Sequence, residues 1–162
     1  MQKEGGFYLA KSKHLDLCRD KPKYPTKKLK MTLGLPTSIN HMYINTPGGG
    51  KRLNSTAEKY VRDARAQINL AMKEQGWRKS FDNTWYYLDM VVYMPDLRKR
   101  DSHNMLKLLL DTLEGFAFHD DYFIMPQIHS VEYDKENPRI EVVIRPQTEN
   151  ERRKALKKVA EA

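Results

Sequence analysis

The sequence predicts a single α/β domain in which two main helices pack on a mixed β-sheet. Stretches with strand-like alternation and stretches with helical spacing follow one another in the order β-α-β-α-β-β. The chain has 162 residues, enough for one domain with a hydrophobic core. It contains no apolar run of about 18 residues, so no membrane span is expected.

The first predicted strand follows a polar segment. Residues 1–30 show no clear period, and we expect an extension that is flexible or folds only on a partner. Residues 31–35 are typical of a short strand that ends at Pro36. Residues 36–51 are interpreted as a loop. Its glycines, Gly48-Gly49-Gly50, indicate either a flexible surface loop or backbone N–H groups that approach a phosphate beside Lys51 and Arg52.

The next two elements have strong patterns. The capping-box pattern Ser55-Thr-Ala-Glu58 begins a helix predicted over residues 56–75, which Gly76 closes. Residues 84–94 alternate as a strand. Asp89 interrupts one apolar-aromatic face of this strand, as either a hydrogen-bonded acid or an additional metal ligand.

The central helix is predicted over residues 102–114, a Leu-rich stretch without Gly or Pro. Asp101 stands where a side-chain acceptor caps a helix start, and Gly115 stands where a helix end is commonly closed. At about 100° per residue, apolar and polar side chains separate onto two arcs. The apolar arc contains Met105, Leu106, Leu109, Leu110 and Leu113, and the polar arc contains His103, Asn104, Lys107, Asp111 and Glu114.

Two further strands and a tail complete the chain. Residues 122–133 and 139–145 are predicted strands, joined by a turn over residues 134–138. Residues 148–162 are predicted to form a charged helical tail. We therefore divide the chain into a basic extension, 1–30, a central domain, 31–146, and a charged tail, 147–162.

Charge is distributed unevenly along these parts. The formal net charge is +8, of which residues 1–30 carry +6 and residues 147–162 carry +2. Basic ends on a neutral central domain favour a polyanionic partner such as nucleic acid, although lysine-rich ends also keep a small protein soluble. The single cysteine, Cys18, excludes an internal disulfide, and no secretory signal pattern is present. These features predict a cytoplasmic protein.

Carboxylates stand at both ends of the central motif. The helix is roughly 20 Å long, and the link from Gly115 to Asp121 spans at most about 20 Å. If the link runs straight back, Asp121 returns beside Asp101. Strand neighbours point to opposite faces, so only one of Asp120 and Asp121 is expected to face the helix, and Asp120 is a further candidate metal ligand beside Asp101 and Asp121. Oxygen ligands of this kind suit Mg²⁺ together with a substrate phosphate. The adjacent basic triplet, Arg98-Lys99-Arg100, would offset the repulsion between these acids and DNA.

Three polar residues of the helix have more than one interpretation. Lys107 either pairs with Asp111 or contacts the phosphate, in which case Asp111 orients it. Asn104 is expected to bond a carboxylate or a water next to the ion. His103 is either inert, a ligand that suits Mn²⁺ better than Mg²⁺, or a proton acceptor near neutral pH.

These residues together resemble the RusA-type Holliday junction resolvases of phages and prophages. The motif is Arg98-Lys-Arg-Asp101-x-x-Asn104-x-x-Lys107-x-x-x-Asp111-x-Leu113, followed by Asp120-Asp121. The upstream stretch Leu35-Pro-Thr-Ser-Ile-Asn40-His-Met-Tyr43 is similar to the same family. The resemblance covers about residues 31–146 and implies catalytic roles for Asp101, Asp121 and Lys107. The family often has a second Asp two residues after the first, where this chain has His103.

The function that the resemblance implies is paired cleavage of four-way DNA junctions by a homodimer. The chemistry would be hydrolysis of phosphodiesters with Mg²⁺, or with Mn²⁺, as the metal ion. One alternative is a non-catalytic regulator that binds junctions or other phage DNA on the same fold. Another is a small protein-binding phage factor whose acidic residues are only surface groups.

Overall fold

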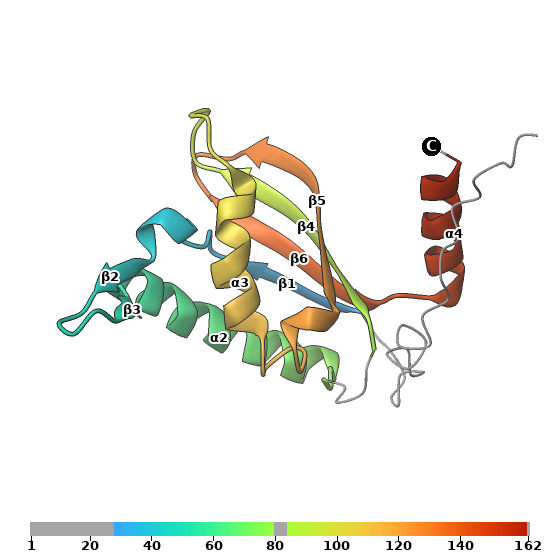
Figure 1. The fold of residues 1–162 in the computed structure, drawn as a ribbon, viewed down its shortest axis with the longest axis horizontal. Coiled ribbons are helices and arrows are strands. Elements are labelled where there is room, and N and C mark those ends of the chain that lie inside the picture. The colour runs from blue at the N-terminus through green and yellow to red at the C-terminus, as the bar shows by residue number, and fades with distance from the viewer. Residues whose placement is uncertain (1–27, 80–83, 162) are drawn as a thin grey trace, which may run out of the picture.

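A four-stranded mixed sheet forms the centre of the structure, a computed structural model that describes residues 28–79 and 84–161 (Figure 1). Its strands are β1 (Leu29–Leu33), β4 (Tyr86–Met94), β5 (Ile124–Tyr133) and β6 (Arg139–Pro146). The strand order is β1-β6-β4-β5. β4 pairs parallel with β5 and antiparallel with β6, and β1 pairs antiparallel with β6. The predicted fold class, a mixed α/β domain, is confirmed.

Two helices cover one face of this sheet. α2 (Ser55–Gln75) runs beside β1, and α3 (Leu106–Leu113) crosses the sheet (Figure 1). The core forms where alternate strand residues, such as Leu88, Met90 and Val92, meet the apolar sides of these helices. Leu109 and Leu113 of α3 are fully buried in this core, as the predicted apolar arc requires.

The start of α2 differs from the prediction. The N-cap is Asn54 rather than Ser55, and its Oδ1 accepts a hydrogen bond of 2.8 Å from the N–H of Ala57. Asn and Ser are comparable caps, so the sequence offers two adjacent candidates. The predicted C-terminal glycine is confirmed, because Gly76 adopts the left-handed conformation with φ of 62°.

The segment interpreted as a loop contains a β-hairpin. Its strands are β2 (Tyr43–Asn45) and β3 (Lys51–Leu53), which pair antiparallel as a second sheet. Gly48 and Gly49 have φ of 97° and 85°, so the turn between these strands uses a backbone conformation that L side chains rarely adopt. Strands of three residues are too short to produce a clear alternation, which is why the sequence did not predict them.

The C-terminal tail is helical, as expected. α4 (Glu149–Ala160) begins at Thr148, whose side chain and backbone form a capping box with Glu151. It projects away from the sheet (Figure 1). No helix in the described part of the chain is long and apolar enough to span a membrane. Residues 1–27, which hold Cys18 and nearly all of the predicted extension, lie outside the described residues.

Candidate functional site

The polar side of the α3 region begins at Asp101. One turn of 3-10 helix, η2 (Ser102–Met105), precedes α3, and Asp101 caps it. The Oδ1 atom of Asp101 accepts a hydrogen bond of 2.9 Å from the His103 N–H and lies 3.3 Å from His103 Nδ1. Asp101 therefore fills the predicted role of helix cap and still exposes carboxylate oxygen to solvent.

A cavity of about 430 Å³ opens at this same end of the helix. It brings the upstream stretch around Asn40 against the start of the central motif. The polar residues that line it are Ser38, Asn40, His41, Lys99, Arg100, Asp101 and Asn104. Two predicted groups of residues, which lie about 60 positions apart in the sequence, therefore meet at one place.

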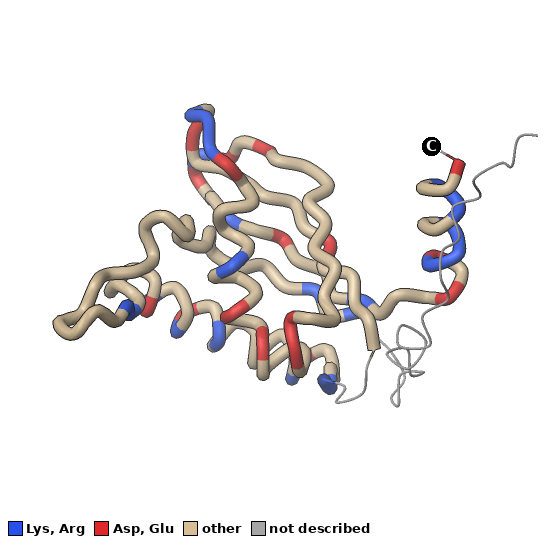
Figure 2. Tube along the Cα trace, in the orientation of Figure 1, with Lys and Arg blue, Asp and Glu red and all other residues tan. Residues whose placement is uncertain are grey.

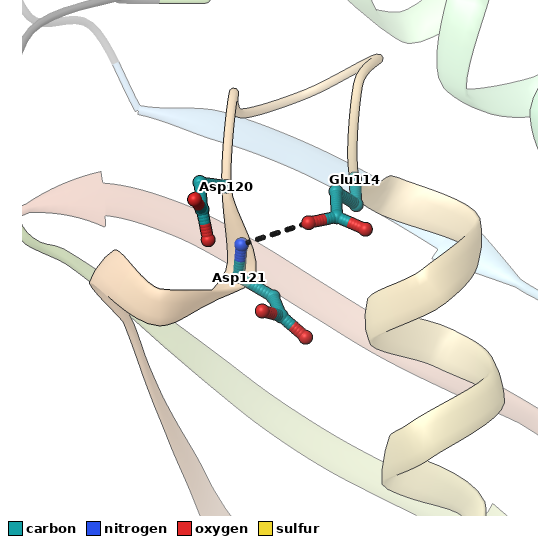
Figure 3. Close-up of side chains that lie close together, drawn as sticks. All are labelled: Glu114, Asp120 and Asp121. Atoms are coloured by element: carbon teal, nitrogen blue, oxygen red, sulfur yellow. Dashed lines mark hydrogen bonds between the residues drawn. The ribbon is translucent and has the colours of Figure 1, made fainter.

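A cluster of three carboxylates lies at the opposite end of α3 (Figure 3). Glu114 follows the last turn of the helix, Asp120 caps the short helix η3 (Asp121–Phe123), and Asp121 begins it. One oxygen from each carboxylate lies within 4.8 Å of the others. The Asp121 N–H donates a hydrogen bond of 3.3 Å to Glu114 Oε1, which holds the two segments together.

Glu114 was placed on the polar arc but was not predicted as a ligand. The available signal was its position immediately before Gly115, which has φ of 76° and reverses the chain. The turn over residues 115–118 is tight, so the Glu114 carboxylate meets the residues that follow the turn.

The structure does not bring Asp101 beside Asp121. At 1.5 Å per residue, Asp101 and Glu114 are separated by about 20 Å along the helix axis. Asp121 accompanies Glu114, and Asp101 stays with His103 at the other end. The expectation that the link runs straight back is wrong, because residues 115–118 form a tight turn. The N–H groups of Ala117 and Gly115 bond the carbonyls of Leu113 and Phe118, each at 2.9 Å.

Burial explains why this link is short. Ala117 and Phe118 are fully buried in the main core, so they anchor the chain directly beneath the end of α3. The estimate from the sequence assumed an extended link, which residues anchored in the core cannot form. Acidic residues consequently lie at both ends of α3, with basic residues in the loop at its start (Figure 2).

Lys107 lies between the two acidic ends. Its Nζ atom is 3.1 Å from Asp111 Oδ1, so the predicted ion pair is present. The pKa of Lys107 is raised, chiefly by this hydrogen bond with Asp111 and to a smaller extent by the charges of Tyr43 and Asp121. The ion pair with Asp111 therefore favours the charged ammonium form of Lys107 further.

The basic triplet is partly neutralised within the chain. Arg98 Nη2 lies 2.8 Å from Asp96 Oδ2, and Arg100 Nη1 lies 2.6 Å from Asp96 Oδ1. The two guanidinium groups hold the pKa of the Asp96 carboxyl well below its usual range. Lys51 and Arg52 are exposed on β3, where Arg52 makes a longer contact of 3.9 Å with Glu58.

Asp89 belongs to a separate network. Its oxygens bond His129 Nε2 at 2.7 Å and Arg145 Nε at 2.5 Å. Its neighbours Leu88 and Met90 point into the core beneath α3, so Asp89 faces the other side of the sheet. These contacts favour the interpretation as a hydrogen-bonded acid rather than a ligand of the α3 site.

A comparison with known families identifies the region that contains these residues. The model of the family described as endodeoxyribonuclease RusA matches residues 34–145, which include the hairpin, α2, α3 and the carboxylate cluster. No curated protein matches the chain.

Proposed function

The chain belongs to the RusA endodeoxyribonuclease family, and from this premise we propose that it resolves four-way DNA junctions by metal-dependent hydrolysis. The observation that carries the proposal is the carboxylate cluster of Glu114, Asp120 and Asp121, about two turns along the same helix from Lys107. Carboxylates suit a cation and an ammonium group suits a phosphate, so these residues together suit a site that binds both.

The three carboxylates fit a hard divalent ion. They supply only oxygen ligands and crowd negative charge that a cation would neutralise. When bound, Mg²⁺ or Mn²⁺ would polarise the phosphate and lower the pKa of an attacking water. We assign Asp121 and Asp120 to the ion, although the sequence predicted that only one of them faces the helix, and we add Glu114.

Lys107 is proposed to bind the phosphoryl oxygens of the scissile phosphate. A lysine ammonium is charged at neutral pH. Positive charge aimed at the phosphoryl oxygens stabilises the transition state more than it stabilises the substrate. Asp111, 3.1 Å away, orients the ammonium group rather than binding the ion.

In the proposed homodimer, Asp101 and His103 of one chain contribute to the site of the other chain. In one chain they lie about 20 Å from the cluster, too far to share an ion with ligands at about 2 Å. A two-fold axis across the exposed side of α3 would set two such helices antiparallel. The start of each helix, with Asp101, His103 and Asn104, would then face the partner's carboxylate cluster. Two-fold symmetry also matches paired cuts in a four-way junction.

DNA contacts are proposed on both sides of this site. Arg98, Lys99 and Arg100 lie at the start of the α3 region, and Lys51 and Arg52 lie on the β2–β3 hairpin. Such residues would recognise the backbone and shape of branched DNA in the cytoplasm rather than its base sequence.

The experiment that tests the proposal uses a labelled mobile four-way junction. Wild-type protein with Mg²⁺ or Mn²⁺ should cut opposing strands in pairs at pH values from roughly 6 to 9, a range that brackets neutral pH. A linear duplex of the same sequence is the matched control. If neither ion supports cleavage of the junction, or if the duplex is cut equally well, the proposal is wrong.

One observation favours a non-catalytic DNA-binding protein as the second candidate. His103 stands where the resemblance implies a second acid, and it is paired with Asp101. This candidate predicts salt-sensitive junction binding that survives chelator and Asp121→Asn, without any cut product. His103→Asp separates the two, because a gain of Mg²⁺-dependent cutting supports the nuclease.

A further inference from the structure

An exposed aromatic side chain adjoins the carboxylate cluster. Tyr122 follows Asp121 directly within η3, and 63% of its surface is accessible to solvent. The Tyr122 N–H donates a hydrogen bond of 2.8 Å to Asp120 Oδ1. The same short turn that positions two of the carboxylates therefore also positions this ring.

Two other aromatic rings hold Tyr122 in place. Its ring meets Phe123 edge to face, with centroids 5.0 Å apart and planes at 89°, and lies 5.7 Å from the ring of Trp85. Trp85 and Phe123 are themselves edge to face at 5.6 Å. Arrangements of this kind are the preferred geometries of aromatic pairs. The Tyr122 ring is thus exposed but held by its neighbours, so the side chain would lose little conformational entropy when a planar ligand binds.

We propose that Tyr122 is a stacking platform for an unpaired nucleobase next to the scissile phosphate. The inference rests on the proposed function, since the phosphate must sit at the adjacent carboxylate cluster. Every base has a π-face, so stacking on Tyr122 would tolerate any sequence and would suit selection by shape. Bases at a branch point are the least costly to unstack, because their pairing is already interrupted.

The test combines a protein change with a DNA change. Junction binding is measured by fluorescence anisotropy in Ca²⁺, with an intact junction and with junctions that carry one abasic nucleotide at each position flanking the cut. Tyr122→Ala removes the ring, and Tyr122→Phe retains its π-face. Tyr133→Ala is the matched control, because Tyr133 is also an exposed tyrosine (51%) but lies at the other end of β5.

The expected result is a specific coupling. Tyr122→Ala should weaken binding of the intact junction by about 5- to 150-fold, the range that corresponds to loss of one stacked base. On the junction whose abasic nucleotide replaces the stacked base, Tyr122→Ala should bind nearly as well as wild type. Tyr122→Phe and Tyr133→Ala should bind every junction as wild type does.

Three outcomes would overturn the inference. Tyr122→Ala could bind as tightly as Tyr133→Ala, or its loss could be equal on every abasic junction. Sedimentation could instead show that Tyr122→Ala is monomeric where wild type is dimeric, which would assign the ring to a subunit contact. If wild type cuts the junction in any of these cases, the proposed nuclease function is retained and only the stacking role of Tyr122 is rejected. If wild type neither binds nor cuts it, both fail.

Discussion

Replacing Asp121 by Asn should change thermal stability in opposite directions with and without metal. Two unit charges 4.8 Å apart repel by about 0.9 kcal/mol in water, and Asp121 makes two such pairs, with Glu114 and Asp120. Screening at physiological salt reduces their sum to about 1 kcal/mol. Loss of the weaker attraction to Lys107 offsets part of this gain, because Lys107 pairs first with Asp111.

Without divalent ions, Asp121→Asn is therefore expected to be more stable than wild type by up to about 1 kcal/mol, which raises Tm by about 2–4 °C. With an ion present at ten times its dissociation constant, wild type gains about 1.4 kcal/mol. The variant should gain much less, because it lacks one of the three carboxylates. When Mg²⁺ or Mn²⁺ is added, the difference in Tm between Asp121→Asn and wild type should consequently shrink or change sign.

Circular dichroism melts in chelator and in each metal ion measure this difference. Asp63→Asn, which removes an exposed carboxylate from the middle of α2, controls for net charge. The reasoning is refuted if Asp121→Asn is less stable than wild type in chelator, or if it shows the same gain in Tm with metal. An equal effect of Asp63→Asn would assign the change to overall charge.

Three further predictions test other parts of the structure. Lys107→Met should lower the single-turnover cleavage rate by about 10²-fold or more, whereas Asp111→Asn, which removes only an orienting partner, should lower it by less than that. Asp96→Asn should release the two arginines of the basic triplet; anisotropy titrations should then show tighter junction binding and a steeper dependence of log Kd on log salt concentration. Leu109→Ala should lower the free energy of unfolding by about 2–5 kcal/mol in urea titrations, because Leu109 is fully buried, while Leu70→Ala, at a site 57% exposed, should change it little.

Local patterns in the sequence were sufficient for most of the fold. The alternation of residues 84–94 predicted β4, and the arc of apolar side chains predicted the burial of Leu109 and Leu113. Leu108 and Thr112 lie outside that arc and are also fully buried. Both patterns arise because one side of each element must face the core. The β2–β3 hairpin was missed because its strands have exposed or half-buried residues throughout and therefore carry no such pattern.

The composition of the candidate site was predicted better than its arrangement. The α3 motif supplied candidate residues for metal and phosphate but did not point to Glu114, and the Lys107–Asp111 pair followed from helical spacing. The distance between Asp101 and Asp121 depends instead on the path of residues 115–118. That path is set by the burial of Ala117 and Phe118 against residues distant in the sequence, which no local pattern reports.

The separation of acids along α3 bears on how a complete site would form. Moving Asp121 to Asp101 within one chain would require residues 115–118 to leave the core, exposing Phe118. Truncating a buried Phe costs about 3–5 kcal/mol, and extraction of the whole side chain together with its turn would cost at least as much. The metal–carboxylate contacts would together have to offset that loss before they contributed to metal binding. The proposed association of two chains would avoid this loss, because each fold would stay intact while opposite ends of two helices meet. On this reasoning the concentration of protein, and not only the concentration of metal, should control the rate of cleavage.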